Sequence, residues 1–553
     1  MHGRIKTRTT EEQKEIARRE KQKKAKAFSE TMRLILEKRA AGVCDPDSLN
    51  LTAGLLTENP DIITLWNYRR EILLEMKLEL DLESYQQLLE KDLYLTEQCL
   101  RVNPKSYGSW HHRIWILDNL PEPDWSREMK LCTKYLQLDE RNFHCWDYRR
   151  TIALRSQVPD LSEYEFTLEK IEANFSNYSA WHLRSKLLPK IFPDPQNRFP
   201  IDEAKHKEEL ELVENAAFTD PNDQSAWFYL RWLLGLTEPK IHFLGLERKD
   251  DIIAVTSRSF KMTEIGSNNF GLQLVVEINN NKAFGTWTSG CDQPQSCLWK
   301  FTPEVKISPE DSVVVILVEN GTELERQNVG PEGFVTEKIN FLPTFSKDLR
   351  DTMTYQLSSC NQLIELEPDS KWTLLTRILL MVCLDCAQCE VEIKSGLENL
   401  TEVDPMRKGY YKDLKSKIVV ELAIEKNKRN SQRFDLRNEK LTSVYHSQNL
   451  WACEEIDLSQ NELPSESLRQ FYSFLRCKRL NLNGNKIKHL SNLPPMPMLE
   501  SLLVESNEID EFDFDLLKRF PKLKYVSLKG NPVADKINMA EYSGSIEINL
   551  STT

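Results

Sequence analysis

Lys105 is the residue whose place in the sequence points most directly to chemistry. It follows Pro104 at a turn between two expected helices, where a side chain points to the rim of the fold and not into a packed seam. Tyr107 lies two residues further on, and His144 and Arg149 occupy equivalent or adjacent positions around the next turn. Together these side chains could line a basic pocket for an anionic group.

Other catalytic and metal-binding patterns are missing from the sequence. Cys383, Cys386 and Cys389 have a spacing similar to that of iron–sulfur ligands, but no fourth Cys or neighbouring His follows, and the stretch is typical of a buried helix. We therefore predict no metal site in this chain. The P-loop, H-E-x-x-H, G-x-S-x-G and dinucleotide-binding patterns are absent, so the chain carries no complete catalytic machinery of its own.

The elements that position Lys105 are predicted from a repeated tryptophan motif. Each copy has a turn, often after an Asn/Asp-Pro pair, and then a Trp; apolar residues at helical spacing separate the copies. This pattern predicts helical hairpins that stack into an α-α superhelix, a crescent in which neighbouring hairpins share a core. The copies are centred on Trp66, Trp110, Trp146, Trp181 and Trp227, with a degenerate sixth at Trp372.

The repeated Trp is interpreted as a core anchor, because a large aromatic side chain at a fixed repeat position fills the seam between hairpins. An Arg three residues after it is expected to pair with an acid or with helix-end carbonyls in that seam. The alternative role is to present positive charge at one rim of the crescent. The residues concerned are Arg69, Arg113, Arg149 and Arg184.

A period-two pattern interrupts the helical repeats and predicts an inserted β-sandwich. Residues 272–278 and 313–318 have the apolar content of strands, and the hairpin dipeptide Asn320-Gly321 follows the second run. A leucine-rich repeat comes later in the chain, with Asn461, Asn485, Asn507 and Asn531 spaced by 24, 22 and 24 residues. The amide of each Asn is expected to satisfy backbone groups in the turn of its coil, and residues 434–441 are expected to form a degenerate first coil.

The predicted fold is therefore multidomain: an α-α superhelix with an inserted β-sandwich and a C-terminal leucine-rich repeat domain. The predicted domains are helical repeats over 1–240, an immunoglobulin-like β-sandwich over 241–345, a second helical part over 346–430 and the leucine-rich repeats over 431–553.

Composition excludes several classes of protein. With 29% charged and 40% apolar residues among 553, the chain is not collagen-like, low-complexity or wholly disordered. It has no apolar run that could span a membrane and no signal-peptide pattern, so we expect a cytoplasmic protein with reduced thiols. The net charge of −12 disfavours nucleic-acid binding. His2, in the basic segment 1–30, could reach a partner's metal, although a solvated terminus is the expected state.

The tryptophan hairpins resemble the α-subunit repeats of the protein prenyltransferases. The inserted sandwich and the leucine-rich tail make the chain similar to the α subunits of the Rab geranylgeranyltransferase (type II) branch, because farnesyltransferase-type α subunits have neither. The resemblance covers nearly the whole chain.

That resemblance implies one half of a heterodimer. The chain would wrap around an α/α-barrel β subunit that holds the catalytic zinc and the isoprenoid tunnel, so the zinc would belong to the partner. The enzyme would transfer a geranylgeranyl group from geranylgeranyl diphosphate to C-terminal cysteines of Rab GTPases. A Rab escort protein, docked on the helices of the α subunit, would present the Rab GTPase.

The resemblance also implies roles for individual residues. The family has a Pro-Lys-x-Tyr turn that reaches the isoprenoid diphosphate, and it stands here as Pro104-Lys105-Ser106-Tyr107. Lys105 and Tyr107 would therefore be catalytic residues. An Asn-Tyr-His turn of the family stands here as Asn142-Phe143-His144, so Phe143 and His144 would bind substrate, without the tyrosine hydroxyl.

Two alternatives compete with this hypothesis. The first is a non-enzymatic scaffold of tetratricopeptide-like and leucine-rich repeats, although the Trp spacing of 35 to 46 residues differs from the 34-residue tetratricopeptide period. The second is the α subunit shared by farnesyltransferase and geranylgeranyltransferase type I, which the leucine-rich residues from about 434 onward oppose.

Overall fold

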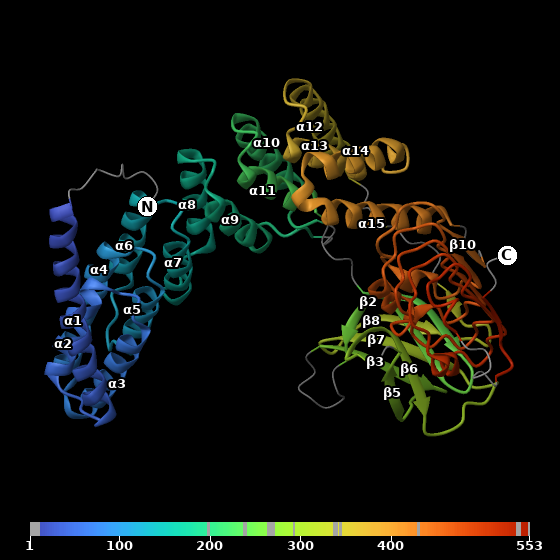
Figure 1. The fold of residues 1–553 in the computed structure, drawn as a ribbon, viewed down its shortest axis with the longest axis horizontal. Helices are drawn as coiled ribbons and strands as arrows, with labels where there is room; N and C mark the ends of the chain where they lie inside the picture. The colour runs from blue at the N-terminus through green and yellow to red at the C-terminus, as the bar shows by residue number, and fades with distance from the viewer. Residues whose placement is uncertain are drawn as a thin grey trace. The chain divides into compact units, whose positions relative to one another are not determined.

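The chain forms two compact units, Met1–Phe192 and Pro193–Thr553 (Figure 1). The computed structural model describes residues 11–195, 199–235, 241–262, 271–290, 293–335, 341, 345–427, 432–537 and 544–550, without the side chains of 11–14 and 17. His2 lies outside the described residues. The predicted domain boundaries at 240/241, 345/346 and 430/431 lie in or near segments that are not described, and they stay predictions.

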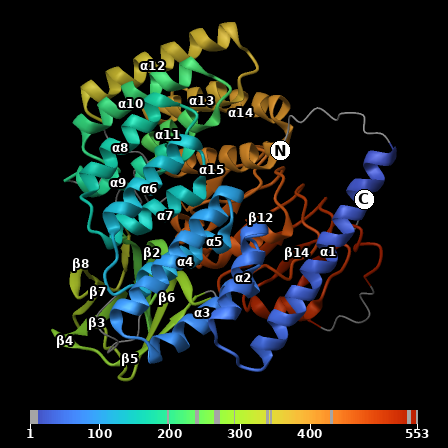
Figure 2. The same cartoon turned by 90° about the vertical axis from the view of Figure 1, so that its left-hand side faces the viewer.

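Helical hairpins make up the first unit, as predicted. They follow α1, which is one long helix (Figure 2). The first helix of a hairpin ends at an Asn or Asp that leaves the helical conformation while its N–H still bonds the carbonyl four residues earlier, as at Asn103. The second helix begins three residues before the repeated Trp. The helices are α1 (Glu11–Ala40), α2 (Pro46–Glu58), α3 (Ile63–Glu79), α4 (Leu82–Val102), α5 (Tyr107–Asn119), α6 (Trp125–Leu138), α7 (Phe143–Arg155), α8 (Asp160–Ala173) and α9 (Tyr178–Ile191).

The repeated Trp is a buried core anchor, as predicted, and it also closes the turn before its helix. Each indole N–H donates to the carbonyl oxygen six residues earlier, for example from Trp110 to Pro104 at 2.9 Å. The side chain at the N-cap of the next hairpin donates to the same oxygen, as Asn142 Nδ2 does to Pro104 at 3.0 Å. One carbonyl therefore ties two consecutive turns together. The indole bonds join Trp66 to Pro60, Trp110 to Pro104, Trp146 to Glu140, Trp181 to Phe175 and Trp227 to Pro221.

Buried carboxylates join successive hairpins of the first unit. Glu128 of α6 accepts from the Arg113 guanidinium of α5 through both oxygens, each at 2.7 Å, and from the Tyr148 hydroxyl of α7 at 2.6 Å. Asp92 of α4 lies in the same way between Arg69 of α3, with which it forms a close ion pair, and His112 of α5, whose Nε2 is 2.6 Å away. Each acid therefore contacts the hairpin before it and the second helix of its own hairpin.

The Arg residues three places after Trp take the seam role that we expected. Arg113 also donates to the Thr96 hydroxyl at 2.8 Å and to the Leu93 carbonyl at 2.9 Å, both on the preceding helix. Arg184 contacts a hydroxyl and a carbonyl at the same two positions of the helix that precedes it. Arg149 is buried and bound to Glu163 at 2.7 and 2.9 Å. The hypothesis that Arg149 lines a basic pocket at the rim is therefore wrong, because a carboxylate in the seam already holds its charge.

The helices of the second unit continue the hairpin pattern. Trp372, the degenerate sixth copy, is buried on α13 with its ring 5.4 Å from that of Phe228 on α11. α13 ends at Asp385, so Cys386 and Cys389 lie in the following turn and not in the buried helix we expected. These elements are α10 (Glu203–Thr219), α11 (Gln224–Leu234), α12 (Lys347–Leu366), α13 (Lys371–Asp385), α14 (Glu390–Val403), η1 (Pro405–Arg407) and α15 (Lys408–Lys426).

Two antiparallel sheets that share one core interrupt these helices, as predicted. The described strands run in the orders β5-β6-β2-β1-β9 and β4-β3-β7-β8. Asn320 and Gly321, with φ of 51° and 81°, form the predicted hairpin turn between β7 and β8. The strands are β1 (Phe243–Arg248), β2 (Ile252–Lys261), β3 (Leu272–Ile278), β4 (Asn281–Lys282), β5 (Gly285–Ser289), β6 (Gln295–Pro303), β7 (Val313–Glu319), β8 (Thr322–Asn328) and β9 (Phe334–Val335).

A parallel sheet in sequence order, β10 to β15, forms the leucine-rich repeats. Asn461 donates to the carbonyls of Leu436 and Leu458 at 2.8 and 2.9 Å and accepts from the Leu441 amide at 3.0 Å, which confirms the predicted role of the repeated Asn. β10 forms the expected first coil, whereas β15 is a coil that the motif did not predict. The elements are β10 (Arg433–Asp435), η2 (Ser447–Leu450), β11 (Glu455–Asp457), η3 (Ser465–Ser473), β12 (Arg479–Asn481), β13 (Ser501–Leu503), η4 (Phe514–Arg519), β14 (Tyr525–Ser527) and β15 (Glu547–Asn549).

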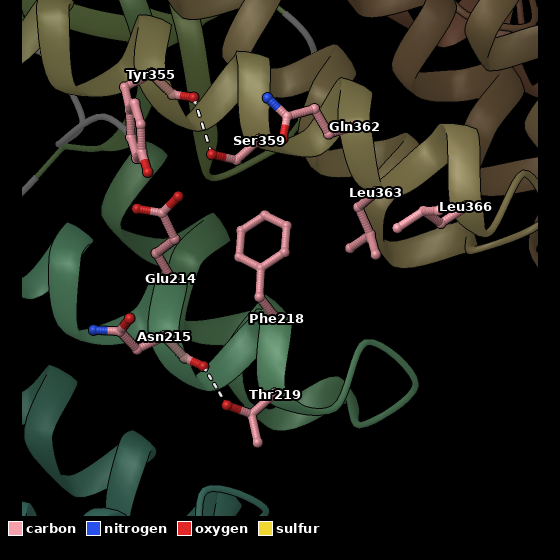
Figure 3. Close-up of a pocket in the computed structure, with 9 residues that line it drawn as sticks. All are labelled: Glu214, Asn215, Phe218, Thr219, Tyr355, Ser359, Gln362, Leu363 and Leu366. Atoms are coloured by element: carbon pink, nitrogen blue, oxygen red, sulfur yellow. Dashed lines mark hydrogen bonds between the residues drawn. The ribbon is translucent and has the colours of Figure 1, made fainter.

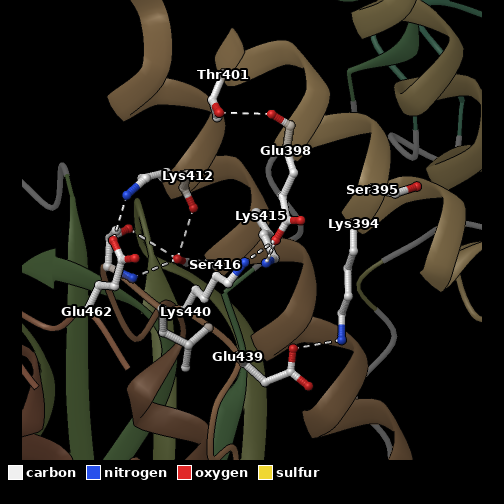
Figure 4. Close-up of polar contacts among 12 residues, drawn as sticks. Lys394, Ser395, Glu398, Thr401, Lys412, Lys415, Ser416, Glu439, Lys440 and Glu462 are labelled. Atoms are coloured by element: carbon white, nitrogen blue, oxygen red, sulfur yellow. Dashed lines mark hydrogen bonds and ion pairs between the residues drawn. The ribbon is translucent and has the colours of Figure 1, made fainter. Parts of the chain in front are cut away.

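The leucine-rich repeats contact both other parts of the second unit. Ion pairs tie them to α14 and α15, including Lys412–Glu462 at 2.6 Å and Lys394–Glu439 at 2.8 Å (Figure 4). On the side of the sandwich, Trp451 packs with Leu244 of β1, and a Cβ added to the neighbouring Gly245 would overlap its indole. None of the described helices is both long and apolar enough to cross a bilayer.

Gly245→Val should lower the free energy of unfolding of the second unit by about 1–3 kcal/mol, because the new side chain must displace the buried Trp451 ring. Urea denaturation followed by circular dichroism measures this change. Gly409→Val is the matched control, because a Cβ at Gly409 meets nothing within 4 Å, and it should change stability by less than about 0.5 kcal/mol. Equal effects of the two substitutions would contradict the packing described for Trp451.

Asp92→Asn should destabilise the first unit by about 3–5 kcal/mol at neutral pH, because it leaves the buried Arg69 charge unpaired. Burial alone would raise the pKa of the Asp92 carboxyl, but Arg69 and His112 hold that pKa at about 2. The unfolded value is about 3.9, so the wild-type stabilisation is present above pH ~4 and is lost as pH falls from ~4 to ~2.

The Asp92→Asn variant should therefore lose less stability than the wild type over that acid range. Denaturation midpoints at pH 7, 4 and 3 test this. Asp118→Asn removes the partly exposed ion pair with Arg155, and as a control it should cost less than about 1 kcal/mol at any of these pH values.

Candidate functional site

Lys105 lies in the turn between α4 and α5 and points to solvent, as predicted. The Asn103 side chain accepts from the Lys105 amide at 3.1 Å, and buried Ser106 caps α5, so the backbone on both sides of Lys105 is fixed. Its side chain is 64% exposed, and its ammonium lies 3.7 Å from a carboxylate oxygen of Asp139 in the next turn. The structure thus presents an exposed cation on a backbone that hydrogen bonds hold on both sides.

Tyr107, Phe143 and His144 form a ring cluster beside this turn. The His144 ring meets that of Tyr107 edge-on at 4.2 Å between centroids and lies 3.9 Å from that of Phe143. Tyr107 and Phe143 are 68% and 50% exposed, whereas His144 is only 7% exposed. The buried imidazole therefore supports two exposed rings, and the four predicted site residues come from two adjacent turns.

The surroundings of His144 keep its imidazole neutral at neutral pH. Burial lowers the pKa of His144, Asp147 raises it and Lys105 lowers it, with a net shift downward. A neutral imidazole can donate one hydrogen bond and accept another. The influence of Lys105 on this pKa also indicates that the ammonium and the ring cluster share one electrostatic environment.

The structure adds residues that the motif did not single out. The first residues of α3, α5, α7 and α9 are all apolar or aromatic and at least half exposed, and they are Ile63, Tyr107, Phe143 and Tyr178. In the sequence, these four exposed side chains can be found as the large residue three positions before each Trp. Arg141 is a second addition: it is exposed and precedes Trp146 by five residues, as Lys105 precedes Trp110.

Cys383 and Cys386 of the cysteine triplet are buried, and Cys389 is partly exposed. Burial raises the pKa of Cys383 and of Cys386 to about 12, so both thiols are protonated at neutral pH. Among the described residues, no group of three or more His, Cys, Asp or Glu side chains is arranged to hold a metal ion.

A groove in the second unit lies between α10 and α12 (Figure 3). It has a volume of about 530 Å³, and apolar side chains such as Phe218, Tyr355 and Leu366 line it together with Glu214 and Ser359. Tyr355 and Leu366 are largely exposed. Exposed aromatic and aliphatic side chains beside polar ones are typical of a surface that contacts another protein.

Known proteins share this organisation. Two of them are geranylgeranyl transferase type-2 alpha subunits: that of Bos taurus is 38% identical over 100% of both chains, and that of Homo sapiens is 38% identical over 98% of both. The family described as "Protein prenyltransferase alpha subunit repeat" matches residues 45–76, 89–120, 125–156, 160–191 and 206–237, and a leucine-rich repeat family matches 413–545. The chain belongs to the family of geranylgeranyl transferase type-2 alpha subunits.

Membership of the type-2 alpha-subunit family makes the chain one subunit of a prenyltransferase and implies a β-subunit partner. It also decides against the scaffold and against the α subunit shared with farnesyltransferase. A type-2 alpha subunit of Dictyostelium discoideum is 41% identical over 42% of this chain and 75% of its own length. The family resemblance expected from the sequence is thus confirmed, whereas the roles of single residues are not tested by these relatives.

Lys105→Met should raise the pKa of His144, because it removes a neighbouring positive charge, and Asp147→Asn should lower it further. Titration of the His144 imidazole resonances by NMR, assigned with a His144→Gln variant, measures both shifts. Lys130→Met, at an exposed position of α6, should leave the pKa unchanged. If the Lys105 and Lys130 variants behave alike, Lys105 is not a neighbour of the ring cluster.

Proposed function

We propose that this chain and its β subunit form a cytoplasmic enzyme that transfers a geranylgeranyl group from geranylgeranyl diphosphate to C-terminal cysteines of Rab GTPases presented by an escort protein. The observation that carries the proposal is the turn between α4 and α5, which holds an exposed Lys105 beside the rings of Tyr107, Phe143 and His144. In the related family, the matching turn reaches the diphosphate.

Lys105 is suited to stabilise the leaving diphosphate. Negative charge on the diphosphate rises as its bond to C1 of the isoprenoid breaks, so an ammonium next to it stabilises the transition state more than the ground state. The ion pair of Lys105 with Asp139 is 3.7 Å long, beyond the 2.7–2.9 Å of a charge-assisted hydrogen bond, and both partners are well exposed. Little free energy would therefore be lost when Lys105 leaves Asp139 to contact a diphosphate.

The ring cluster is suited to hold the substrate. The Tyr107 hydroxyl is a neutral donor on an exposed ring and can add a hydrogen bond to a diphosphate oxygen. Phe143 offers an apolar face, which suits isoprenoid carbon, and it lacks the hydroxyl of the family's Tyr. His144 packs edge-on against Tyr107 at 4.2 Å, so it fixes the direction in which that ring points.

We place the catalytic zinc on the β subunit, where its chemistry would be a lowered pKa for the substrate cysteine. This chain would hold the diphosphate end of the reaction and the escort protein. For the escort protein, we propose the helices of the second unit, where the groove between α10 and α12 offers exposed Tyr355 and Leu366.

Lys105→Ala in the assembled heterodimer should lower turnover on the order of ten- to a thousandfold, because one electrostatic stabiliser of the leaving group is lost. Assembly should stay intact, since Lys105 is exposed and makes one long ion pair. Single-turnover transfer from labelled geranylgeranyl diphosphate to an escorted Rab GTPase measures the rate, and size-exclusion chromatography checks assembly.

Lys130→Ala is the matched control, an exposed lysine on the next helix, and should keep the wild-type rate. Lys105→Arg should recover part of the activity because it restores a positive charge. A wild-type rate in Lys105→Ala would remove Lys105 from the mechanism. Activity of this chain without its β subunit would overturn the division of roles as a whole.

A further inference from the structure

Three positive side chains surround one buried indole in the second unit. The guanidinium carbons of Arg407 and Arg231 lie 4.9 and 5.1 Å from the centroid of the Trp372 ring, and the Lys371 ammonium lies 5.2 Å from it. The Phe228 ring, 4.4 Å from Arg231, completes the cluster. An aromatic face attracts a cation, but it does not neutralise three.

A single carboxylate pairs with these cations. Asp404 accepts from Arg407 at 2.7 Å and from the Tyr411 hydroxyl at 2.9 Å. No described carboxylate forms an ion pair with Arg231 or Lys371. Three positive and one negative side chain therefore leave a charge of +2 in the cluster. Burial lowers the pKa of the Arg231 guanidinium, Tyr410 and Tyr411 raise it, and the charge of Arg407 lowers it, with a net shift downward.

The cluster around Trp372 also contains hydrogen-bond donors that have no side-chain acceptor. Arg231 Nη2 is buried and has no hydrogen-bond partner among the described residues. The N-cap of α13, Ser370, bonds the Thr373 hydroxyl at 2.8 Å and does not cap a backbone amide. The first amides of α13, at Lys371 and Trp372, thus lie next to the cluster without a side-chain acceptor. A buried donor without a partner costs free energy, which an acceptor bound at this cluster would recover.

We propose that Arg231, Lys371, Arg407 and the first amides of α13 bind a phosphate group. A phosphate dianion matches the charge of +2, whereas one carboxylate would leave a positive charge unbalanced. The guanidinium fork and a helix N-terminus are both suited to phosphate oxygens. The group can arrive as inorganic phosphate or on a phosphorylated side chain, since the chemistry recognised is the same.

Isothermal titration of the full-length heterodimer with inorganic phosphate, at constant ionic strength, tests this site. We expect saturable binding of one phosphate that Lys371→Gln and Arg231→Met each weaken at least tenfold. Lys347→Gln is the matched control, because Lys347 is exposed at the first position of α12, where Ser346 does cap the helix. Lys105→Ala separates this binding from any at the α4–α5 turn and should leave the Lys371-dependent part unchanged.

The source of the phosphate is decided by a second pair of titrations. A peptide Ac-Gly-phosphoserine-Gly-amide that binds more tightly than inorganic phosphate would assign the site to a phosphorylated partner, and weaker binding would assign it to the free ion. The unphosphorylated peptide should not bind. Lys371 is partly exposed, so the Lys371→Gln variant should fold even if the Arg231→Met variant does not. Binding that is absent, equal for acetate, or unaffected by Lys371→Gln would overturn the proposal.

Discussion

The buried carboxylate between successive hairpins is the interaction on which the helical repeats depend. Glu128 satisfies Arg113 on one side and Tyr148 on the other, and Asp92 does the same for Arg69 and His112. Such a charge is costly to bury unless every partner is in place. Each acid therefore stabilises only the arrangement in which both neighbouring helices have the correct rotation and height.

That arrangement also brings the site together. The Pro104 carbonyl accepts from the Trp110 indole of its own hairpin and from the Asn142 side chain of the next. Lys105 directly follows Pro104, and His144 follows Asn142 by two residues, so this shared acceptor holds their two turns side by side. The ammonium and the ring cluster thus meet because of hydrogen bonds that are buried beneath them, and the exposed side chains need no contacts of their own to stay close.

Much of this could be read from the sequence, where a residue type repeats at a fixed position. The Trp anchors, the Asn ladder and the Lys105 turn are of this kind. Arg149 was misplaced as a pocket residue because its partner Glu163 lies on another helix, and a motif does not show which buried acid faces it. The repeat motif does not predict β15, because the coil of β15 lacks the repeated Asn. The sequence does not single out Ile63 and Tyr178, because the feature that they share is exposure to solvent. In the proposed enzyme the substrate and the zinc would belong to other molecules, so one chain's sequence would give only this half of the site.

The contact of Trp451 with the backbone at Gly245 has a consequence for how such chains evolve. The indole fills a hollow in the sandwich that exists only because residue 245 has no side chain, and Leu244, Val255 and Leu298 share this small core. A lineage that lost only the leucine-rich repeats would expose apolar surface on the sandwich. A lineage that lost only the sandwich would expose the Trp451 side chain to solvent. The two modules are therefore easiest to acquire or to shed as a pair.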